Sequence, residues 1–410
     1  MLKHELLRRY LIPFVTMTGS FGTKNVWLID AYAGPGKYGS DADGVEVPGS
    51  PTIICDLSKR QLSRGVKLHG VFIEREKPFV SQLRQVVNEA DPQHALHEVL
   101  EGDAEQHLGA AVVKAGSDPL LIFLDPFGTS LSLEVLCGAI AGRSKRSPTE
   151  ILLNFNLEAV WRIGGLLTKK SPNQADEKTL ARADAFLGGP WWRRAFVEAR
   201  SGGTQAASVA ATHVASEYQR TLFRRTGLHS IHVPIRRRPD HQPLFLLTLF
   251  YAHPAAPVKF VEAASAANGA WRSYNKQKDL EAELTKNSDH SLFPDEWLLD
   301  MSAKEHERTE RDLEAEWVNI IAANIRRLLE SSVEITLETQ LLEVYGTTVT
   351  LAREKHLNRA WDTVAAEGIA QPRLKGQQHP KQWFQVIKRA APVVPASGSK
   401  SDRPASVRRL

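Results

Sequence analysis

The chain has 410 residues, of which 42% are hydrophobic, and a formal net charge of +5. This length is enough for one large domain with its own core and a smaller second module. The two cysteines, Cys55 and Cys137, are isolated in the sequence, which excludes a disulfide framework and a cysteine-based metal site. The N-terminus mixes acidic and basic residues, and no later apolar run reaches about 18 residues. The sequence therefore predicts a cytoplasmic protein without a membrane segment.

Short apolar runs alternate with helical patterns through the first half of the chain. An amphipathic helix is expected first, because Leu6, Leu7, Tyr10, Leu11 and Phe14 recur at helical spacing. Helical patterns over 77–87 and 131–140 separate later runs. The predicted strands are 25–30, 70–74, 96–100, 119–125 and 150–156. This alternation predicts an α/β fold with a doubly wound, Rossmann-like parallel sheet.

The chain changes character after the fifth predicted strand. Residues 157–227 lack strand patterns and are expected to form a helical insertion, whereas 230–238 and 244–251 are expected to pair as an antiparallel hairpin. A parallel sheet that ends in a reversed hairpin is the layout of Rossmann methyltransferases, whereas dinucleotide dehydrogenases end in a parallel strand. The methyltransferase-like domain is predicted to span residues 1–295.

A different module is expected beyond it, over residues 296–390. Charged helical patterns at 302–329, 336–344 and 355–367 precede a segment, 370–387, that contains Arg373, Lys375, Lys381 and Trp383. Helices followed by a basic, aromatic hairpin are typical of a winged-helix-like module, which binds either nucleic acid or protein. The Pro-, Ser- and Arg-rich stretch 391–410 is predicted to be a disordered basic tail.

The first predicted strand leads into a glycine turn that we interpret as the centre of a nucleotide pocket. Gly34 and Gly36 allow close approach of the backbone to a ligand, and Asp30 offers a carboxylate to the amino group of a methionine moiety. Residues 34–39 match G-x-G-x-x-G, but that motif should open a helix at once, whereas 40–48 has a loop-like composition. S-adenosyl-L-methionine is thus favoured over a dinucleotide. The alternative is a plain tight turn.

Acids also follow the second and third strands. Glu74 is expected to accept hydrogen bonds from both ribose hydroxyls, and Asp103 to accept one from the adenine amine. The long spacing between the glycine turn and Glu74 is explained if 38–47 is an exposed loop and Ser50 or Thr52 caps the next helix. A solvated acid at a helix start and a turn aspartate are the respective alternatives.

An Asp-Pro-Phe-Gly turn follows the fourth strand. Asp125 and the Pro126 carbonyl can accept hydrogen bonds from an exocyclic amine while Phe127 stacks on its base, which makes these three the candidate catalytic residues. A purely structural turn is the alternative. Asn154 and Arg162, after the fifth strand, are candidate substrate-binding residues, and Asn156 and Trp161 lie at the same predicted edge.

Three basic clusters could contact phosphates, or could be solvated faces. They are Arg193-Arg194, Arg224-Arg225 and Arg236-Arg237-Arg238. The histidines show no metal-ligand spacing, so no metal site is expected.

The order of several short segments resembles the bacterial three-Cys-motif partner protein family (TcmP). The segments are Lys3-His4, 29–36, Gly49-Ser50-Pro51, 72–74, 124–128 and 153–155. The resemblance covers about residues 1–270 and, less distinctly, the C-terminal helices. It implies a Rossmann methyltransferase-like domain and a partner that carries a three-cysteine motif, itself radical-S-adenosylmethionine-like. Tyr32 stands where this family usually has another aromatic, often Phe.

The Asp-Pro-Phe-Gly turn is also similar to that of tRNA guanine dimethyltransferases, over a few residues only. The leading hypothesis is therefore an S-adenosylmethionine-dependent methyltransferase that acts on an exocyclic amine of DNA or RNA. One alternative is a non-catalytic protein that binds cofactor or nucleic acid and recruits a second polypeptide. A small-molecule methyltransferase is a third.

Overall fold

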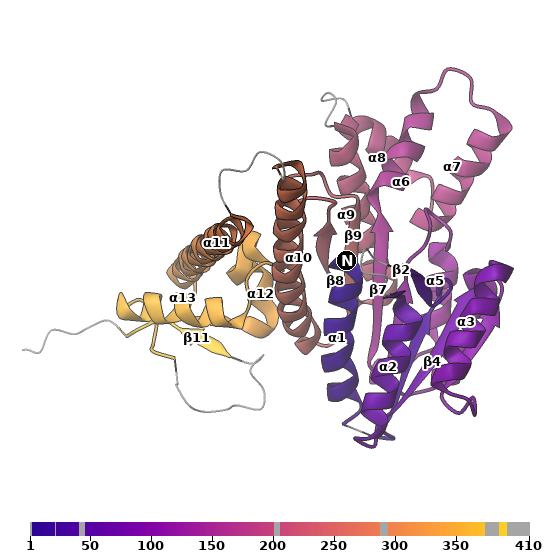
Figure 1. The fold of residues 1–410 in the computed structure, drawn as a ribbon, viewed down its shortest axis with the longest axis horizontal. Helices are drawn as coiled ribbons and strands as arrows, with labels where there is room; N and C mark the ends of the chain where they lie inside the picture. Colours follow the sequence, from indigo (N-terminus) through magenta and orange to yellow (C-terminus); the bar gives the residue numbers. More distant parts are fainter. Residues whose placement is uncertain are drawn as a thin grey trace, which may run out of the picture.

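The computed structural model describes residues 2–20, 22–40, 46–200, 206–287, 294–373 and 385–391. Its largest feature is a seven-stranded sheet with the order β5-β4-β1-β6-β7-β9-β8 (Figure 1). The strands of this sheet are β1 (Asn25–Asp30), β4 (Lys67–Glu74), β5 (His97–Glu101), β6 (Leu120–Leu124), β7 (Thr149–Asn156), β8 (His229–Ile235) and β9 (Phe245–Tyr251).

The strand directions match the layout expected from the sequence. Strands β5, β4, β1, β6 and β7 are parallel, and β9 runs antiparallel between β7 and β8. Strand order reverses beside β1, where the connections move from one side of the sheet to the other. The predicted doubly wound sheet ending in an antiparallel hairpin is thus confirmed, and ligands bind at the carboxyl edge of such sheets, near the reversal.

Both faces of the sheet are buried. All five residues of β6 are inaccessible, with Leu121 and Phe123 in one core cluster and Leu120, Ile122 and Leu124 in the other. Continuous apolar runs of this kind form where helices cover both sides. The first face packs against α1 (Leu2–Thr18), α2 (Ser50–Leu62), α3 (Lys77–Ala90) and α10 (Ala255–Asn287).

The opposite face packs against α4, α5 and the helices of the predicted insertion. These elements are α4 (Ala104–Ala115), α5 (Leu133–Ala141), α6 (Leu157–Gly164), the 3-10 helix η1 (Gly165–Thr168), α7 (Gln174–Leu187), α8 (Trp191–Arg200) and α9 (Ala206–Thr226). The described residues of 157–227 form helices joined by short connections at 169–173 and 188–190 and contain no strand, as expected of a helical insertion.

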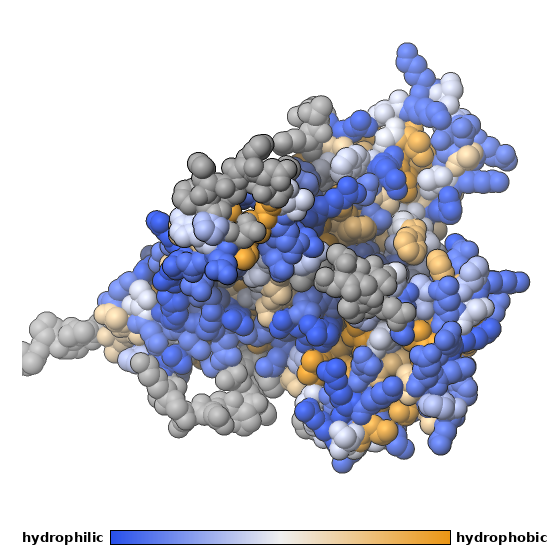
Figure 2. Space-filling view, in the orientation of Figure 1, coloured by the Kyte–Doolittle hydropathy of each residue, from blue (hydrophilic) through white to orange (hydrophobic). Residues whose placement is uncertain are grey.

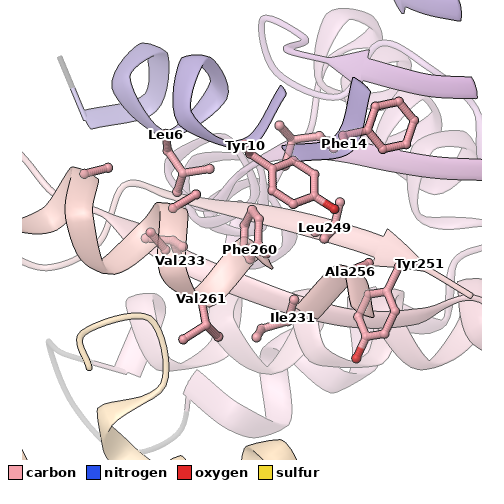
Figure 3. Close-up of a cluster of buried hydrophobic side chains, with 14 of the residues drawn as sticks. Leu6, Tyr10, Phe14, Ile231, Val233, Leu249, Tyr251, Ala256, Phe260 and Val261 are labelled. Atoms are coloured by element: carbon pink, nitrogen blue, oxygen red, sulfur yellow. The ribbon is translucent and has the colours of Figure 1, made fainter. Parts of the chain in front are cut away.

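Helix α1 is fixed across the sheet by one buried polar contact. The Tyr10 hydroxyl donates to Glu150 of β7 at 2.6 Å, and the Tyr10 ring packs edge-on against Phe260 of α10 (Figure 3). Burial raises the pKa of Glu150 to about 7, and the hydrogen bond from Tyr10 opposes this rise. Leu6, Tyr10 and Phe14 face the core, as their helical spacing predicted.

Two local expectations were wrong. The segment predicted as an exposed loop over 38–47 contains the antiparallel pair β2 (Lys37–Ser40) and β3 (Glu46–Pro48); residues 41–45 lie outside the described part. Neither Ser50 nor Thr52 caps α2, because the N-cap is Gly49 without a side-chain hydrogen bond. The Thr52 hydroxyl instead donates to the Gly36 carbonyl at 2.6 Å.

The C-terminal elements form a separate group beside α10 (Figure 1). They are α11 (Asp295–Ser331), β10 (Glu334–Thr336), α12 (Leu337–Tyr345), the 3-10 helix η2 (Gly346–Thr348), α13 (Glu354–Ala366) and β11 (Val386–Lys388). Strand β10 pairs antiparallel with β11, and Ala370 forms an isolated bridge with Arg389. Figure 2 shows a largely hydrophilic surface over these helices.

Helix α10, for which the sequence patterns gave no prediction, joins the two groups. Its first half packs on α1 and β9, while Ser265 and Asn268 donate to the carbonyls of Leu351 and Thr350. Further along, Arg272 forms a bidentate pair with Glu310 of α11, at 2.6 Å for each bond. The predicted boundary at residue 295 and the limits of both modules stay predictions.

Some expectations fall outside the described residues. Lys375, Lys381 and Trp383 of the predicted basic hairpin do so, as does all but Ala391 of the predicted tail. Across the described ranges, no helix combines the length and apolar character that a membrane crossing requires.

The buried Glu150 should make stability depend on pH. Its pKa is about 7 when folded and 4.5 in the reference state, so the stability that its protonated form contributes is complete below pH 4.5 and is lost as pH rises through 7. Glu150→Gln should remove this loss. The free energy of unfolding of the variant relative to wild type should rise by about 3 kcal/mol between pH 4.5 and 7.5. Urea unfolding at both pH values measures it; exposed Glu338→Gln, the control, should show no such change.

Candidate functional site

The glycine turn after β1 is held in a left-handed conformation that requires glycine. Gly34 has φ +64° and Gly36 has φ +82°. The Gly36 carbonyl accepts hydrogen bonds from the Gly49 N–H at 2.9 Å and from the Thr52 hydroxyl at 2.6 Å. A Cβ on Gly49 would lie 2.7 Å from that same oxygen. The return of the chain from β3 into α2 therefore clamps the turn.

Asp30, the last residue of β1, is a buried carboxylate with one bare oxygen. Its Oδ1 accepts from the Tyr32 N–H at 3.2 Å, and its Oδ2 has no partner within the described protein. Burial raises the pKa of Asp30 to about 7; the Ser50 side chain and the Tyr32 N–H oppose the rise, and the charge of Asp125 adds to it. A buried, unpaired carboxylate oxygen is costly unless a donor is supplied.

Glu74 closes β4 beside the same turn. One of its oxygens accepts from the Gly34 N–H at 2.8 Å and the other accepts from the Glu76 N–H at 2.7 Å. Asp103 lies farther out, at the N-cap position of α4, where its carboxylate is about half exposed and pairs with Arg75 at 3.4 Å. The structure thus joins Glu74 directly to the glycine turn, whereas Asp103 contacts Arg75.

Asp125 stands immediately after β6 and is engaged on both oxygens. Oδ1 accepts from the Asn154 side-chain amide at 2.7 Å, and Oδ2 forms an ion pair with Lys3 of α1. Asn154 is itself buried, and its own Oδ1 has no partner among the described residues. Beyond Pro126, the Phe127 ring is 93% exposed. The turn therefore joins a held carboxylate to a free aromatic surface.

Three residues that the chemical argument from sequence did not use complete this edge. The Tyr38 ring stacks on His4 with centroids 5.9 Å apart, and its hydroxyl lies near Gly34. Burial raises the pKa of Tyr38, and the charges of Asp125, Asp30 and Glu74 raise it further, so the hydroxyl lies among all three carboxylates. Burial also lowers the pKa of His4 to about 4. Lys3-His4 appeared in the sequence only through the family resemblance.

The structure places one of the two candidate substrate-binding residues next to Asp125 and the other on the exposed face of a helix. Asn154 contacts Asp125, but Arg162 is exposed on α6 and forms no contact with Asp125. Asn156 has a structural role, because its side chain accepts from the Ala159 N–H at 2.8 Å and caps α6. Trp161 is 37% exposed on the same helix. In the described ranges, no cluster of three or more histidine, cysteine or acidic side chains could hold a metal ion.

Comparisons with known proteins add distant likenesses. No family model matches the chain, and no curated protein matches it. Solved structures that match include the proposed methyltransferase yhhF from Escherichia coli, at 17% identity over 37% of this chain and 68% of that one, with a TM-score of 0.23. Another is YjhP from E. coli, at 10% identity over 58% of this chain and 90% of that one, with a TM-score of 0.24.

A third is an S-adenosylmethionine-dependent methyltransferase from Geobacter sulfurreducens, in complex with S-adenosyl-L-homocysteine. It is 11% identical over 58% of this chain and 89% of that one, with a TM-score of 0.23. At such distances the strand order of the chain itself carries the fold assignment.

The glycine turn should be intolerant of a side chain. A Cβ on Gly36 would meet three atoms of Val86 at 3.3 Å, and alanine is strained at φ +82°. Gly36→Ala should lower the free energy of unfolding by about 1–2 kcal/mol. Gly39→Ala is the matched control, since nothing lies within 4 Å of its Cβ. Urea denaturation of both variants tests the clamp; equal stabilities would contradict it.

Proposed function

We propose that this protein is an S-adenosylmethionine-dependent methyltransferase whose acceptor is an exocyclic amine of a nucleic-acid base. The observation that carries the proposal is a pair of buried, unpartnered acceptor oxygens, Asp30 Oδ2 and Asn154 Oδ1, at one edge of the sheet. Each requires a hydrogen-bond donor that the described protein does not supply. Asp125, which lies near Asp30 and bonds Asn154, connects the two positions.

The residues around the glycine turn fit the cofactor. Asp30 Oδ2 would accept from the amino group of its methionine part, and the Gly34–Gly36 turn lets the backbone approach closely. Glu74 would hold the ribose hydroxyls with its remaining lone pairs, as each oxygen already accepts one backbone bond. Asp103 would receive the adenine amine once released from Arg75. When bound, the cofactor supplies a methyl group that is already activated as a sulfonium.

The acceptor side needs orientation more than a strong base. Asp125 and the Pro126 carbonyl would accept the two hydrogens of an amine, which directs its lone pair toward the methyl donor. Phe127, almost fully exposed, would stack on the base that bears this amine. The Asn154 amide and the ammonium of Lys3 hold the Asp125 carboxylate in place from two sides.

The C-terminal group would serve recognition. The order α11, β10, α12, α13, β11 and the pairing of β10 with β11 support a winged-helix-like module. Its α13 presents Lys355 and Arg359 next to Glu314, which neutralises part of their charge. A three-Cys-motif protein, implied by the family resemblance, is the proposed partner.

One observation favours the non-catalytic alternative. Lys3 already occupies Asp125 Oδ2, the position where a substrate amine would bind. A chain that keeps this ion pair would bind cofactor and recruit a partner without transferring a methyl group. Activity measurements on the Asp125 and Lys3 variants separate the two readings.

Cofactor binding should depend on the ionisation of Asp30. Because its pKa is about 7, the carboxylate must lose a proton below that pH before it can pair with the methionine ammonium. The Kd for S-adenosylmethionine should therefore be about eightfold weaker at pH 6 than at pH 7.5. Calorimetric titration measures it, and Asp30→Asn should bind weakly with no such pH dependence. Absence of saturable binding to wild type would reject the cofactor assignment.

Methyl transfer should require Asp125. Asp125→Ala removes the acceptor of the amine and should reduce transfer of labelled methyl from S-adenosylmethionine to bulk RNA or sheared genomic DNA by about a hundredfold or more. Lys3→Met should keep transfer detectable, since it frees Asp125 Oδ2. Asp312→Asn, on the exposed face of α11, controls for the loss of one carboxylate. Undiminished transfer by Asp125→Ala would show that the catalytic assignment is wrong.

A further inference from the structure

The three arginine clusters of the sequence differ in how their charge is compensated. Arg193 pairs with Asp184 at 2.7 Å, Arg194 with Glu198 at 2.6 Å and Arg225 with Glu134 at 2.5 Å. Arg224 donates to the Thr221 hydroxyl at 3.0 Å and pairs with no carboxylate of the described residues. In the third cluster, at the β8–β9 turn, neither Arg236 nor Arg237 bonds any residue that the structure describes. This turn therefore carries two uncompensated guanidinium groups.

The turn lies on the same edge of the sheet as Asp125. Ile235 pairs with Phe245, and Phe245 pairs with Asn156 at the end of β7. Two strand spacings of about 4.8 Å each separate the end of β8 from the end of β7. Arg236 and Arg237 follow Ile235 directly, so they lie at the edge that carries Asp125, which follows β6, one strand beyond β7. Arg224 and Arg225, at the end of α9 that precedes β8, lie at the opposite edge.

Several contacts hold this turn rigidly. Arg238 pairs with Asp279 of α10 at 2.6 Å. Gln242 accepts from Ser208, in the first turn of α9, at 3.0 Å. The Leu157 N–H donates to the Leu244 carbonyl at 3.0 Å, which ties the turn to the start of α6. The N-terminal end of α9 carries positive partial charge, so it adds to the field of the arginines.

Arg236 is less exposed to solvent than its neighbour Arg237. This side chain is half-buried, and desolvation lowers its pKa, although a guanidinium stays charged at neutral pH. A partly desolvated cation without a counter-charge gains more from an incoming anion than a fully solvated one does. Asp240 is the one carboxylate in residues 236–244, so the segment keeps a net positive charge.

Aromatic surfaces lie along the same edge. Trp161, 37% exposed, is on α6, which follows Asn156, and Phe127, 93% exposed, follows Asp125. Proteins that bind single-stranded nucleic acid combine backbone-binding cations with such stacking surfaces. An extended strand is favoured over a duplex, because a base must leave its stack to reach Asp125.

We infer that Arg236 and Arg237 form a phosphate-binding surface that holds the backbone of a single-stranded nucleic acid beside the site. This inference rests on the proposed function, whose substrate it places, and it assigns the two arginines that the earlier argument left without a role. Arginine suits the task because its planar donors can bind a phosphate through two parallel hydrogen bonds.

Fluorescence anisotropy with labelled oligouridylate and oligodeoxythymidylate tests the inference. Strands of about 20 nucleotides exceed the ~4–16 that one single-strand site covers. For the full-length wild type, log Kd should rise linearly with log salt, and the Arg236→Gln/Arg237→Gln variant should reduce the slope by about 1.4 and weaken binding roughly twentyfold at 0.1 M salt. Arg236→Lys/Arg237→Lys should retain most of the slope. Preference for one oligonucleotide would identify the sugar.

The matched control is Arg60→Gln/Arg224→Gln, which removes the same charge from exposed positions at the opposite edge. It should leave the salt slope unchanged. An equal loss in this control, an unchanged slope in the first variant, or no salt-dependent binding by wild type would each overturn the inference. Titration with S-adenosylmethionine separates the two proposals: intact nucleic-acid binding without cofactor binding would reject methyl transfer and retain the phosphate surface.

Discussion

Burial of both faces of the central sheet is the constraint from which the candidate site follows. With helices on each side, a strand such as β6 can carry only apolar residues along its length, and polar groups gather where the strands end. At the carboxyl edge this brings Asp30, Glu74 and Asp125 close enough together for all three charges to act on the Tyr38 hydroxyl. The three carboxylates thus lie together at this edge because helices bury both faces of the sheet.

Two buried acids of the same strand system show how a structural carboxyl differs from a candidate functional one. Burial raises the pKa of both Glu150 and Asp30 to about 7. Glu150 receives the Tyr10 hydroxyl and so fixes α1 to the sheet. Asp30 is also buried, but its Oδ2 has no hydrogen-bond partner among the described residues. Glu150 thus receives its hydrogen-bond donor from within the protein, whereas Asp30 Oδ2 needs a donor from a ligand. For this reason Asp30, and not Glu150, supports a ligand site.

The sequence predicted the elements better than the contacts between them. Alternating apolar runs located β1 at its observed bounds, because a buried parallel strand must be continuously apolar. The β2–β3 pair was missed, since its short strands lack such a run, and the Ala-rich α10 was not predicted. For the site, position at strand ends singled out Asp30, Glu74 and Asp125. The roles of Lys3 and Tyr38 could not be read in this way, because Lys3 reaches Asp125 across 122 positions of the chain and no local pattern encodes that pairing.

Helix α10 packs against the sheet domain on one side and against the C-terminal elements on the other. Its first half covers α1 and β9, where Phe260 meets Tyr10, and it also donates to the loop before α13 and pairs with α11. A fragment that ends near residue 295 would keep α10 but lose α11. Arg272 of α10 would then lack both its partner Glu310 and the Trp317 ring on which its guanidinium stacks. An exchange of the C-terminal part would therefore have to keep or rebuild the face of α10 that contacts Thr350, Leu351 and Glu310.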